Sequence, residues 1–432
     1  MSSRLLRRRA ATAVWVWSAA AFGILGTVVA ARRLGLEEFG LFATTLAVVG
    51  FFQVLVDLTV EETLTKYGFR YVATREWGRL RRLFRSLLVL KVAGGALATL
   101  VLVVLAPFAD ELFDAEGIAT AIVAAASLPL VQSVENVGAT ALLLRSRYDL
   151  RGAYQAGSSG LRLLAIVVGS SHGVAETLVA IVLAQLVAST AVSFAGIAAL
   201  RRFPDGARAE LGADVPEITS FVVQSSIATG VISLRTTLVP ILLGVVAGPT
   251  QVGLFRIAQA PLQGLAVASS PVRLVLLTEQ TRDWERGERA KVFAGIRRYT
   301  RFAGGMMLVA VPAFLVAMPW LVEVVFGGEY EGAVAAARIV LLAAALHFTI
   351  GWTKSFPVTI GRPRLRIVTH GLEAIVAVPL AVVLGATWGA TGAAAAVLAS
   401  AVVFAVAWGG ILVRMRAELR AGAGSTERAV AR

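Results

Sequence analysis

The sequence predicts an all-α integral membrane protein with about twelve transmembrane helices, in two six-helix lobes related by a parallel pseudo-twofold, with both termini cytoplasmic. Three observations support this fold. The 432 residues are 57% hydrophobic and only 16% charged, whereas soluble proteins are about 45–50% apolar and about 25% charged. Long apolar runs recur along the chain, and a weak repeat divides it near its midpoint. This composition excludes a disordered protein and a soluble enzyme.

Each predicted span is an apolar run of about 20 residues, the length that crosses a bilayer core. The first run follows four arginines but is too long for a cleaved signal peptide, so we expect a retained signal anchor. The runs cover about 12–31, 41–60, 86–106, 118–142, 154–170, 177–199, 219–245, 254–277, 301–322, 333–353, 366–386 and 392–413.

Three of these spans depart from a plain apolar helix. The fifth is interrupted by Arg162 and by the small residues at 157–160. The seventh is long and rich in hydroxyl side chains, which favours a tilted or broken helix. Pro261 and Pro271 lie in the eighth, and proline removes a helical hydrogen bond, so a kink is expected there.

The positive charge orients the chain. Of the 41 Lys and Arg residues, 33 fall in segments that would be cytoplasmic if the N-terminus is cytoplasmic, and only Arg32 and Arg33 fall in outside loops. This asymmetry is the positive-inside pattern of multi-pass membrane proteins. The net charge of +14 is therefore explained by orientation in the cytoplasmic (inner) membrane, and no nucleic-acid partner is expected.

A repeat relates the two halves of the chain at offsets of 213–216 residues. Both halves hold six spans, so both enter the membrane from the same side and the repeat is parallel. The predicted lobes are residues 1–208 and 209–432, joined by a polar cytoplasmic linker near 200–218. The matching segments are Gly40–Phe42 with Gly253–Phe255, Phe113–Glu116 with Phe326–Glu329, Arg147–Arg151 with Arg362–Arg366, and Gly173–Ala175 with Gly389–Thr391.

No catalytic or cofactor-binding pattern is present in the sequence. There are no cysteines, no P-loop, no His-Glu-x-x-His and no Asp-x-Asp pair. His172, His347 and His370 are too few and too dispersed to predict a site. We therefore expect no enzyme, no metal and no cofactor.

Polar residues within the spans are the predicted substrate-binding residues, because charge in lipid is costly and usually functional. On the eighth span, Arg256, Gln259, Gln263, Ser270 and Arg273 fall on one helical face. Arg162 in the fifth span and Arg235 in the seventh join this set. A second interpretation stays open for the eighth span, in which its two arginines extend to the membrane surfaces.

Carboxylates within or near the spans are the predicted ion-coupling residues. They are Asp57 near the end of the second span, Glu135 in the fourth and Glu373 in the eleventh. Such a group either carries protons or sodium or neutralises a buried arginine. For Asp57, a solvated helix end is a further alternative.

These side chains together indicate a large amphiphile as substrate. Guanidinium groups bind phosphate through paired hydrogen bonds, and amide and hydroxyl side chains suit sugar hydroxyls. A lipid with a phosphorylated, glycosylated head group carries both chemistries.

Four segments resemble the Wzx-type (RfbX-like) polysaccharide biosynthesis flippases of the multidrug/oligosaccharidyl-lipid/polysaccharide (MOP) exporter superfamily. They are Arg33–Phe42, Val252–Ala258, Phe326–Tyr330 and Trp388–Ala394. The resemblance implies outward translocation of polyprenyl-diphosphate-linked oligosaccharides by alternating access driven by an ion gradient. It carries over one site residue, Arg256, which lies within a matching segment.

The partners expected from this resemblance are membrane lipids, the lipid-linked glycan, and a glycan polymerase or glycosyltransferases. Two alternatives remain at this stage. One is a non-transporting membrane scaffold of a glycan assembly complex. The other is a cation-coupled multidrug antiporter, which the scarcity of central carboxylates disfavours.

Overall fold

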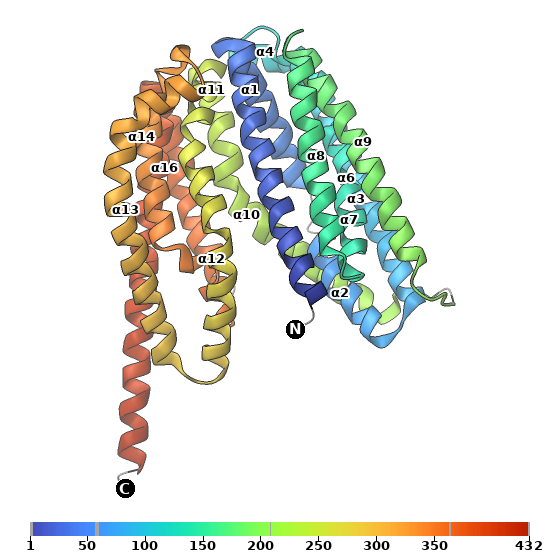
Figure 1. The fold of residues 1–432 in the computed structure, drawn as a ribbon, viewed down its shortest axis with the longest axis vertical. Helices are drawn as coiled ribbons and strands as arrows, with labels where there is room; N and C mark the ends of the chain where they lie inside the picture. The colour runs from blue at the N-terminus through green and yellow to red at the C-terminus, as the bar shows by residue number, and fades with distance from the viewer. Residues whose placement is uncertain (1–2, 57–59, 208, 363, 431–432) are drawn as a thin grey trace. The chain divides into compact units, whose positions relative to one another are not determined.

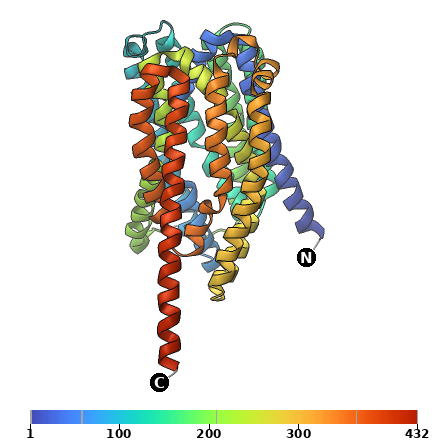
Figure 2. The same ribbon diagram turned by 90° about the vertical axis from the view of Figure 1, so that its left-hand side faces the viewer.

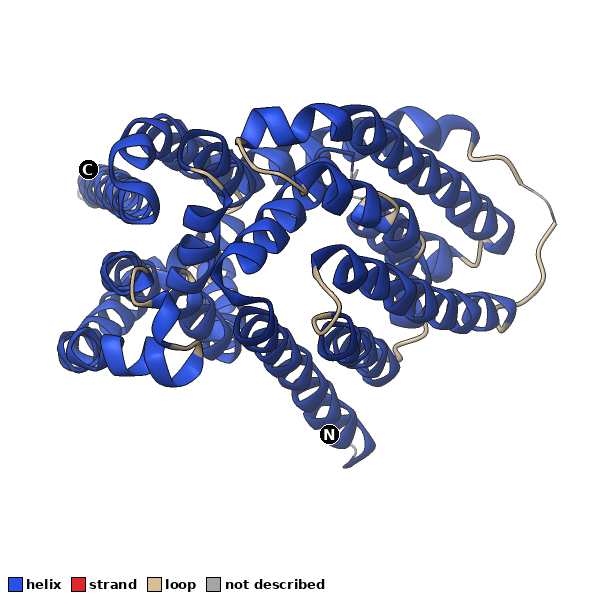
Figure 3. Ribbon diagram, turned by 90° about the horizontal axis from the view of Figure 1, so that it is seen from above, coloured by secondary structure: helices blue, strands red, loops and turns tan. Residues whose placement is uncertain are grey.

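The computed structural model describes residues 3–56, 60–207, 209–362 and 364–430. Over these ranges the chain forms helices and connecting loops, without strands (Figure 3). The all-α prediction is therefore confirmed. Short 3-10 turns, Ala106–Phe108 (η1), Gly212–Asp214 (η2), Gly328–Tyr330 (η3) and Gly351–Lys354 (η4), lie between α-helices.

The α-helices follow one another closely along the chain (Figure 1). They are α1 Ser3–Val56, α2 Val60–Thr74, α3 Trp77–Leu105, α4 Ala109–Phe113, α5 Ile118–Ala125, α6 Leu128–Ser133, α7 Glu135–Leu144, α8 Tyr148–Gly169, α9 Val174–Arg201, α10 Val215–Ala247, α11 Pro249–Ala258, α12 Ala260–Glu285, α13 Arg289–Val325, α14 Ala333–Thr349, α15 Phe356–Thr359 and α16 Arg364–Val430.

Several of these helices differ in extent from the predicted spans. Helix α1 covers the first two spans and α16 the last two, each interrupted by a glycine, at Gly35 and Gly389. The fourth span is divided into α5, α6 and α7, whereas α8 is continuous despite its small residues. Among the described residues, six helices are long and apolar enough to cross a membrane, or seven if one bent pair is a single span. The count of twelve spans and the side of the termini stay predictions.

The breaks expected in the seventh and eighth spans are present. Helix α10 bends by 47° between its halves, and Pro240 within it cannot donate to the carbonyl four residues earlier. The eighth span is divided into α11 and α12 at Gln259. This residue immediately precedes α12 and lies two positions before Pro261. The stripe predicted on the eighth span therefore does not lie on one straight helix.

The chain divides into two compact units. The first holds residues 1–256 with 322–331, and the second holds 257–321 with 332–432. In the first unit α8 packs between α1 and α9 (Figure 1). In the second, α14 packs against α12 and α16, and the C-terminal part of α16 extends beyond its neighbours (Figure 2). The predicted lobe boundary at 208/209 stays a prediction.

The repeat is visible in the backbone of the loops. Gly35 and Gly248 are 213 residues apart and both have positive φ, at 76° and 83°. Gly173 and Gly389, 216 residues apart, also have positive φ. Side chains other than glycine rarely adopt this conformation. Equivalent turns in the two halves therefore use glycine at equivalent positions.

Contacts between the two halves of the chain occur within the first unit. The Tyr330 hydroxyl donates to the carbonyl of Ala31 over 2.7 Å. The Phe113 ring lies against Gly244, where an added Cβ would approach it to 3.0 Å. The 322–331 segment is thus held to the first unit by the hydrogen bond of Tyr330.

The two repeated Gly-Leu-Phe segments also touch each other in the first unit. A Cβ on Gly253 would lie 3.1 Å from the Cα of Gly40. A Cβ on Gly40 would lie 2.6 Å from the carbonyl oxygen of Pro249, too close for any real Cβ. Glycine is therefore required at 40 because two backbones approach closely.

Arg32 and Arg33, the two bases of the predicted outside loops, bind helix ends. Arg32 donates to the carbonyls of Val325, over 2.8 Å, and of Val324 at the end of α13. Arg33 donates to the carbonyl of Val167 in the last turn of α8. The last carbonyls of a helix lack helical partners and carry partial negative charge, so these two arginines stabilise helix C-termini.

The predicted linker is docked on α2 and α3. Glu217 accepts two hydrogen bonds of 2.9 Å from Arg70, and Tyr71 donates to Asp214 over 2.7 Å. Arg81 binds Asp205 at 2.8 Å. The Arg70 guanidinium, followed by the Tyr67 hydroxyl, lowers the pKa of the Glu217 carboxyl to about 2. The linker is thus held to the first half by charge-assisted contacts.

Candidate functional site

A chain of amide side chains crosses the helices of the first unit, with Gln185 of α9 at its centre. Gln185 is only 6% exposed. It donates to the Glu135 carboxylate and to the Ser189 hydroxyl over 3.1 Å, and accepts from Gln132 over 3.1 Å. Gln132 in turn accepts a hydrogen bond from Gln53 of α1. Buried polar groups need such partners, because an unmet one costs about 1–3 kcal/mol.

A small cavity of about 20 Å³ lies at the Gln53 end of this chain. Gln53, Gln132 and Asn136 supply amides to its wall, and Lys91 of α3 also lines it. Lys91 is 6% exposed, so its side chain is enclosed by the protein.

The other end of the chain leads to two arginines. Glu135 hydrogen-bonds Ser158 of α8, and Arg162 follows Ser158 by four residues, which places both on one face of the helix. Arg162 and Arg256 belong to the same unit, and Arg256 lies within electrostatic range of Arg162. One polar track therefore runs through this unit, and we call it the first-unit track. It contains Gln53, Gln185, Glu135, Arg162 and Arg256.

The arginine end of this track holds two positive charges. Among the described residues, no carboxylate forms an ion pair with Arg162 or Arg256. Arg162 is partly buried and Arg256 is exposed. A cation at membrane depth without a counterion is costly. The arrangement suits an anion that arrives from outside the protein.

The remaining predicted site residues are distributed as follows. Gln259 and Gln263 are partly buried and belong to the second unit, at and after the break in the eighth span. Asp57 lies outside the described residues, as do the side chains of Arg235 and Arg273. Arg338 hydrogen-bonds the carbonyl of Leu315 over 3.0 Å and is exposed, as a surface residue. The substrate and ion roles assigned from the sequence stay predictions.

Two histidines that are dispersed in the sequence meet at one carboxylate in the structure. His347 of α14 and His370 of α16 both bind Glu373. His347 Nε2 lies 2.9 Å from Glu373 Oε1, and His370 Nδ1 lies 3.0 Å from Oε2. Helix packing joins residues 23 positions apart in a way that spacing alone does not reveal. We call these three residues the His-Glu-His triad.

Two residues of the first-unit track were also missed, Gln185 and Ser158. The available signal was a lone amide in the apolar run of the sixth span. For the triad, the signal was the three-residue spacing of His370 and Glu373, which places them on one helical face.

Comparison with known families decides the classification. A family model described as "Polysaccharide biosynthesis protein" matches residues 6–276, more than half of the chain. The chain belongs to this family. No curated protein matches the sequence.

Solved structures of MOP-superfamily transporters share the fold. A multidrug resistance MATE family transporter in an inward-facing conformation has a TM-score of 0.73 at 15% identity, over 92% of this chain and 95% of that one. The lipid II flippase MurJ in an inward closed conformation has a TM-score of 0.70 at 10% identity, over 92% and 86%. A MOP transporter from Pyrococcus furiosus has a TM-score of 0.52 at 15% identity, over 95% and 92%. The resemblance seen in the sequence is thus confirmed for family and fold, and the chain is a multi-pass membrane protein.

Proposed function

We propose that this protein translocates a polyprenyl-diphosphate-linked oligosaccharide across the cytoplasmic membrane by alternating access, for cell-surface polysaccharide biosynthesis. The observation that carries the proposal is a pair of arginines within electrostatic range of each other, with no ion-pair partner among the described residues, in a member of a polysaccharide biosynthesis family.

The chemistry of the first-unit track matches the proposed head group. A diphosphate offers several anionic oxygens, and each guanidinium binds such oxygens through paired, charge-assisted hydrogen bonds. The amides of Gln53, Gln132 and Asn136 can donate to and accept from sugar hydroxyls. The substrate anion would supply the charge that Arg162 and Arg256 lack within the protein.

The same feature argues against the two alternatives. A cationic drug would be repelled by adjacent arginines, since like charges in a low-dielectric site are costly. A non-transporting scaffold has no need of uncompensated cations at membrane depth. A MOP transporter from Pyrococcus furiosus is described as having a binding pocket of reverse polarity that suggests a different function, which fits a fold that serves substrates of different charge.

Transport into liposomes tests the proposal. The full chain is reconstituted with a fluorescent polyprenyl-diphosphate oligosaccharide, and movement between leaflets is followed with and without an imposed ion gradient. We expect faster movement than in empty liposomes. No acceleration with several glycans would overturn the proposal, and acceleration of an organic cation instead would favour the antiporter.

Substitution of the arginines is the matched test of the site. Arg162→Ala or Arg256→Ala should slow translocation by about 10- to 100-fold, because a charge-assisted hydrogen bond contributes about 1.5–3 kcal/mol and 1.4 kcal/mol corresponds to a tenfold change. Arg338→Ala, at an exposed arginine, should leave the rate unchanged. Normal rates in both track variants would remove the assignment of these residues.

A further inference from the structure

The His-Glu-His triad lies within the second unit and is protected from solvent. Glu373 is 1% exposed, and the side chains of His347 and His370 are 14% and 20% exposed. Both imidazole rings stack on the ring of Phe404, at centroid distances of 5.5 and 5.0 Å. These contacts fix the ring planes and leave each histidine one nitrogen directed at the carboxyl group.

The hydrogen bonds of His347 determine where its protons are. His347 Nδ1 lies 2.9 Å from the carbonyl oxygen of Ala343. A carbonyl only accepts, so Nδ1 must carry a hydrogen. In neutral histidine the other nitrogen, Nε2, would then be an acceptor. Yet Nε2 faces Glu373 Oε1 at 2.9 Å, and an ionised carboxylate is also only an acceptor.

This contact therefore requires one additional proton. Either His347 is the imidazolium and donates from Nε2, or Glu373 is protonated and donates to Nε2. His370 completes the arrangement by donating from Nδ1 to Oε2 over 3.0 Å. Relative to two neutral histidines and a carboxylate, the observed geometry holds one more proton and carries no net charge.

We propose that His347, Glu373 and His370 form a proton-binding site that is loaded in this conformation and whose release of the proton is coupled to transport. Binding of the proton rests on the geometry alone. Coupling rests on the proposed function. The reaction is a simple transfer, in which one proton passes from water to the His347–Glu373 contact and returns to water on release.

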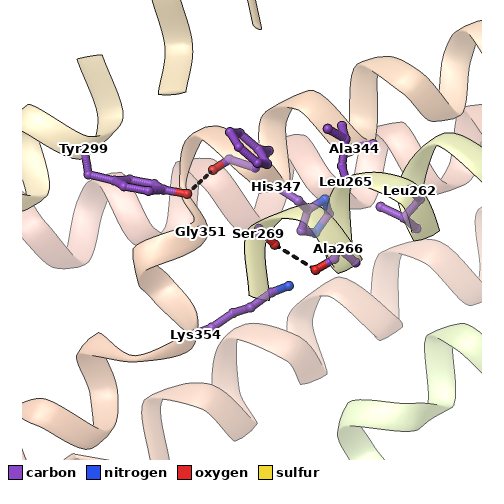
Figure 4. A pocket seen from close by; sticks show the side chains of 10 residues that line it. Leu262, Leu265, Ala266, Ser269, Tyr299, Ala344, His347, Gly351 and Lys354 are labelled. Atoms are coloured by element: carbon purple, nitrogen blue, oxygen red, sulfur yellow. Dashed lines mark hydrogen bonds between the residues drawn. The ribbon is translucent and has the colours of Figure 1, made fainter. Parts of the chain in front are cut away.

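A cavity of about 40 Å³ beside His347 supplies the route (Figure 4). It is comparable to the space of a single water molecule. His347 lines it together with Ser269 of α12, Tyr299 of α13 and Lys354 of η4. His347 thus borders the cavity and also contacts the buried carboxyl group, so water in the cavity can exchange a proton with the ring when one of its two hydrogen bonds opens.

The charged and titratable groups around the triad limit how many protons it holds. Lys354 lines the same cavity, as does the Tyr299 hydroxyl, which donates to the Phe348 carbonyl over 2.9 Å. Arg366 precedes His370 by one helical turn on α16. The side chains of 271–278 on α12 lie outside the described residues. Because Lys354 and Arg366 are cations, a second proton on the triad is disfavoured, and we expect a single proton to exchange.

Loss of that proton would weaken the contact between α14 and α16 at His347 and Glu373. With Glu373 ionised and His347 neutral, the single imidazole hydrogen can be on Nδ1 or on Nε2, but not on both. The histidine then keeps its bond to Ala343 or its bond to Glu373 and loses the other. With the hydrogen on Nδ1, the lone pair of Nε2 would face the ionised carboxylate at 2.9 Å, and two acceptors at that distance repel each other. Proton release thus favours a rearrangement of these helices.

Histidine-nitrogen NMR of the unmodified full chain tests proton binding. The protein has only three histidines, so signals are assigned with His172→Gln, His347→Gln and His370→Gln. At neutral pH we expect His347 with both nitrogens protonated, or with Nδ1 protonated and Nε2 accepting a hydrogen bond. A His347 protonated at Nε2 alone would overturn the proposal, because that state lacks the additional proton.

Coupling is tested by the liposome assay under an imposed pH gradient. Glu373→Gln keeps the size of the side chain and removes the acid. We expect this variant to lose the acceleration by the gradient, whereas His172→Gln, at an exposed turn, keeps it. A Glu373→Gln protein that still responds fully would overturn coupling. Absence of transport by the unmodified chain would overturn the proposed function and with it the coupling, while the NMR result decides proton binding independently.

Discussion

At the scale of single residues, two kinds of intramembrane polar side chain are distinguished by their partners. Gln185 makes hydrogen bonds to three neighbours and is fully enclosed. Arg162 lies within α8, and Arg256 lies within electrostatic range of it. The first kind holds the helices of the first unit together. The second kind costs stability and is therefore a candidate for substrate contact.

Gln185 provides a test of this distinction. Gln185→Leu would remove one hydrogen-bond partner from Gln132 and one from Glu135 in a buried setting, which should lower the free energy of unfolding by about 1–3 kcal/mol. Denaturation of the purified protein in detergent measures it. Leu186→Ala, at the adjacent exposed position, is the control and should have little effect. Equal stability of Gln185→Leu and the unmodified protein would contradict a structural role for the network.

At the scale of elements, helix ends and close crossings explain features that composition alone leaves open. Arg32 and Arg33, the two bases of the predicted outside loops, bind the C-termini of α13 and α8. They depart from the positive-inside distribution of Lys and Arg, and their role is to stabilise helix ends. The linker is held on α2 and α3 by ion pairs. The contact of Gly40 with Pro249 and Gly253 joins the corresponding segments of the repeat.

The glycine contact predicts a position-specific effect. Gly40→Ala would place a Cβ 2.6 Å from the Pro249 carbonyl oxygen, and backbone must move to admit it, so the melting temperature should fall. Gly50→Ala, where nothing lies within 4 Å of the added Cβ, is the matched control and should be tolerated. Similar melting temperatures for the two variants would show that this crossing is not tightly packed.

The docking of the linker predicts a pH dependence. The pKa of Glu217 in the folded protein is lowered to about 2 from an ordinary 4.5. Because the pKa of Glu217 is lower in the folded than in the unfolded protein, its carboxylate stabilises the fold at pH values above the unfolded pKa. That stability is lost as the pH falls from the unfolded pKa to the folded one. Thermal unfolding should therefore become easier between pH 4.5 and 2, and less so in Glu217→Gln. The same pH profile in both proteins would show that the Glu217 contact does not stabilise the fold.

At the scale of the whole molecule, membrane orientation follows from the distribution of bases. The sequence contains no cysteine, so single cysteines can be introduced for labelling without first removing native ones. Ser171→Cys lies in a predicted outside loop and Ala290→Cys in a predicted cytoplasmic segment, and both positions are exposed. In intact cells an impermeant thiol reagent should label the first and not the second. The opposite pattern would invert the predicted topology.

The sequence by itself determined the class of the protein and the position of its helices. In lipid every backbone polar group must be satisfied within the segment, so apolar runs of sufficient length predict helices reliably. The kinks in α10 and at Gln259 were also foreseen from polar composition and from proline. These properties are local, because they depend on neighbouring residues of the chain.

Only the tertiary structure decided which polar side chains meet. Gln185 and Glu135 are 50 residues apart, and His347 and Glu373 are 26 apart. Their spacing carries no information about contact, since it is the packing of α9 on α7 and of α14 on α16 that brings them together. The sequence predicted Arg162, Arg256 and Glu373 as polar residues in lipid. The fold places the first two in one unit and brings the third into contact with two histidines, because interactions between distant residues are set by helix packing. Their roles toward an anion and a proton are our proposals.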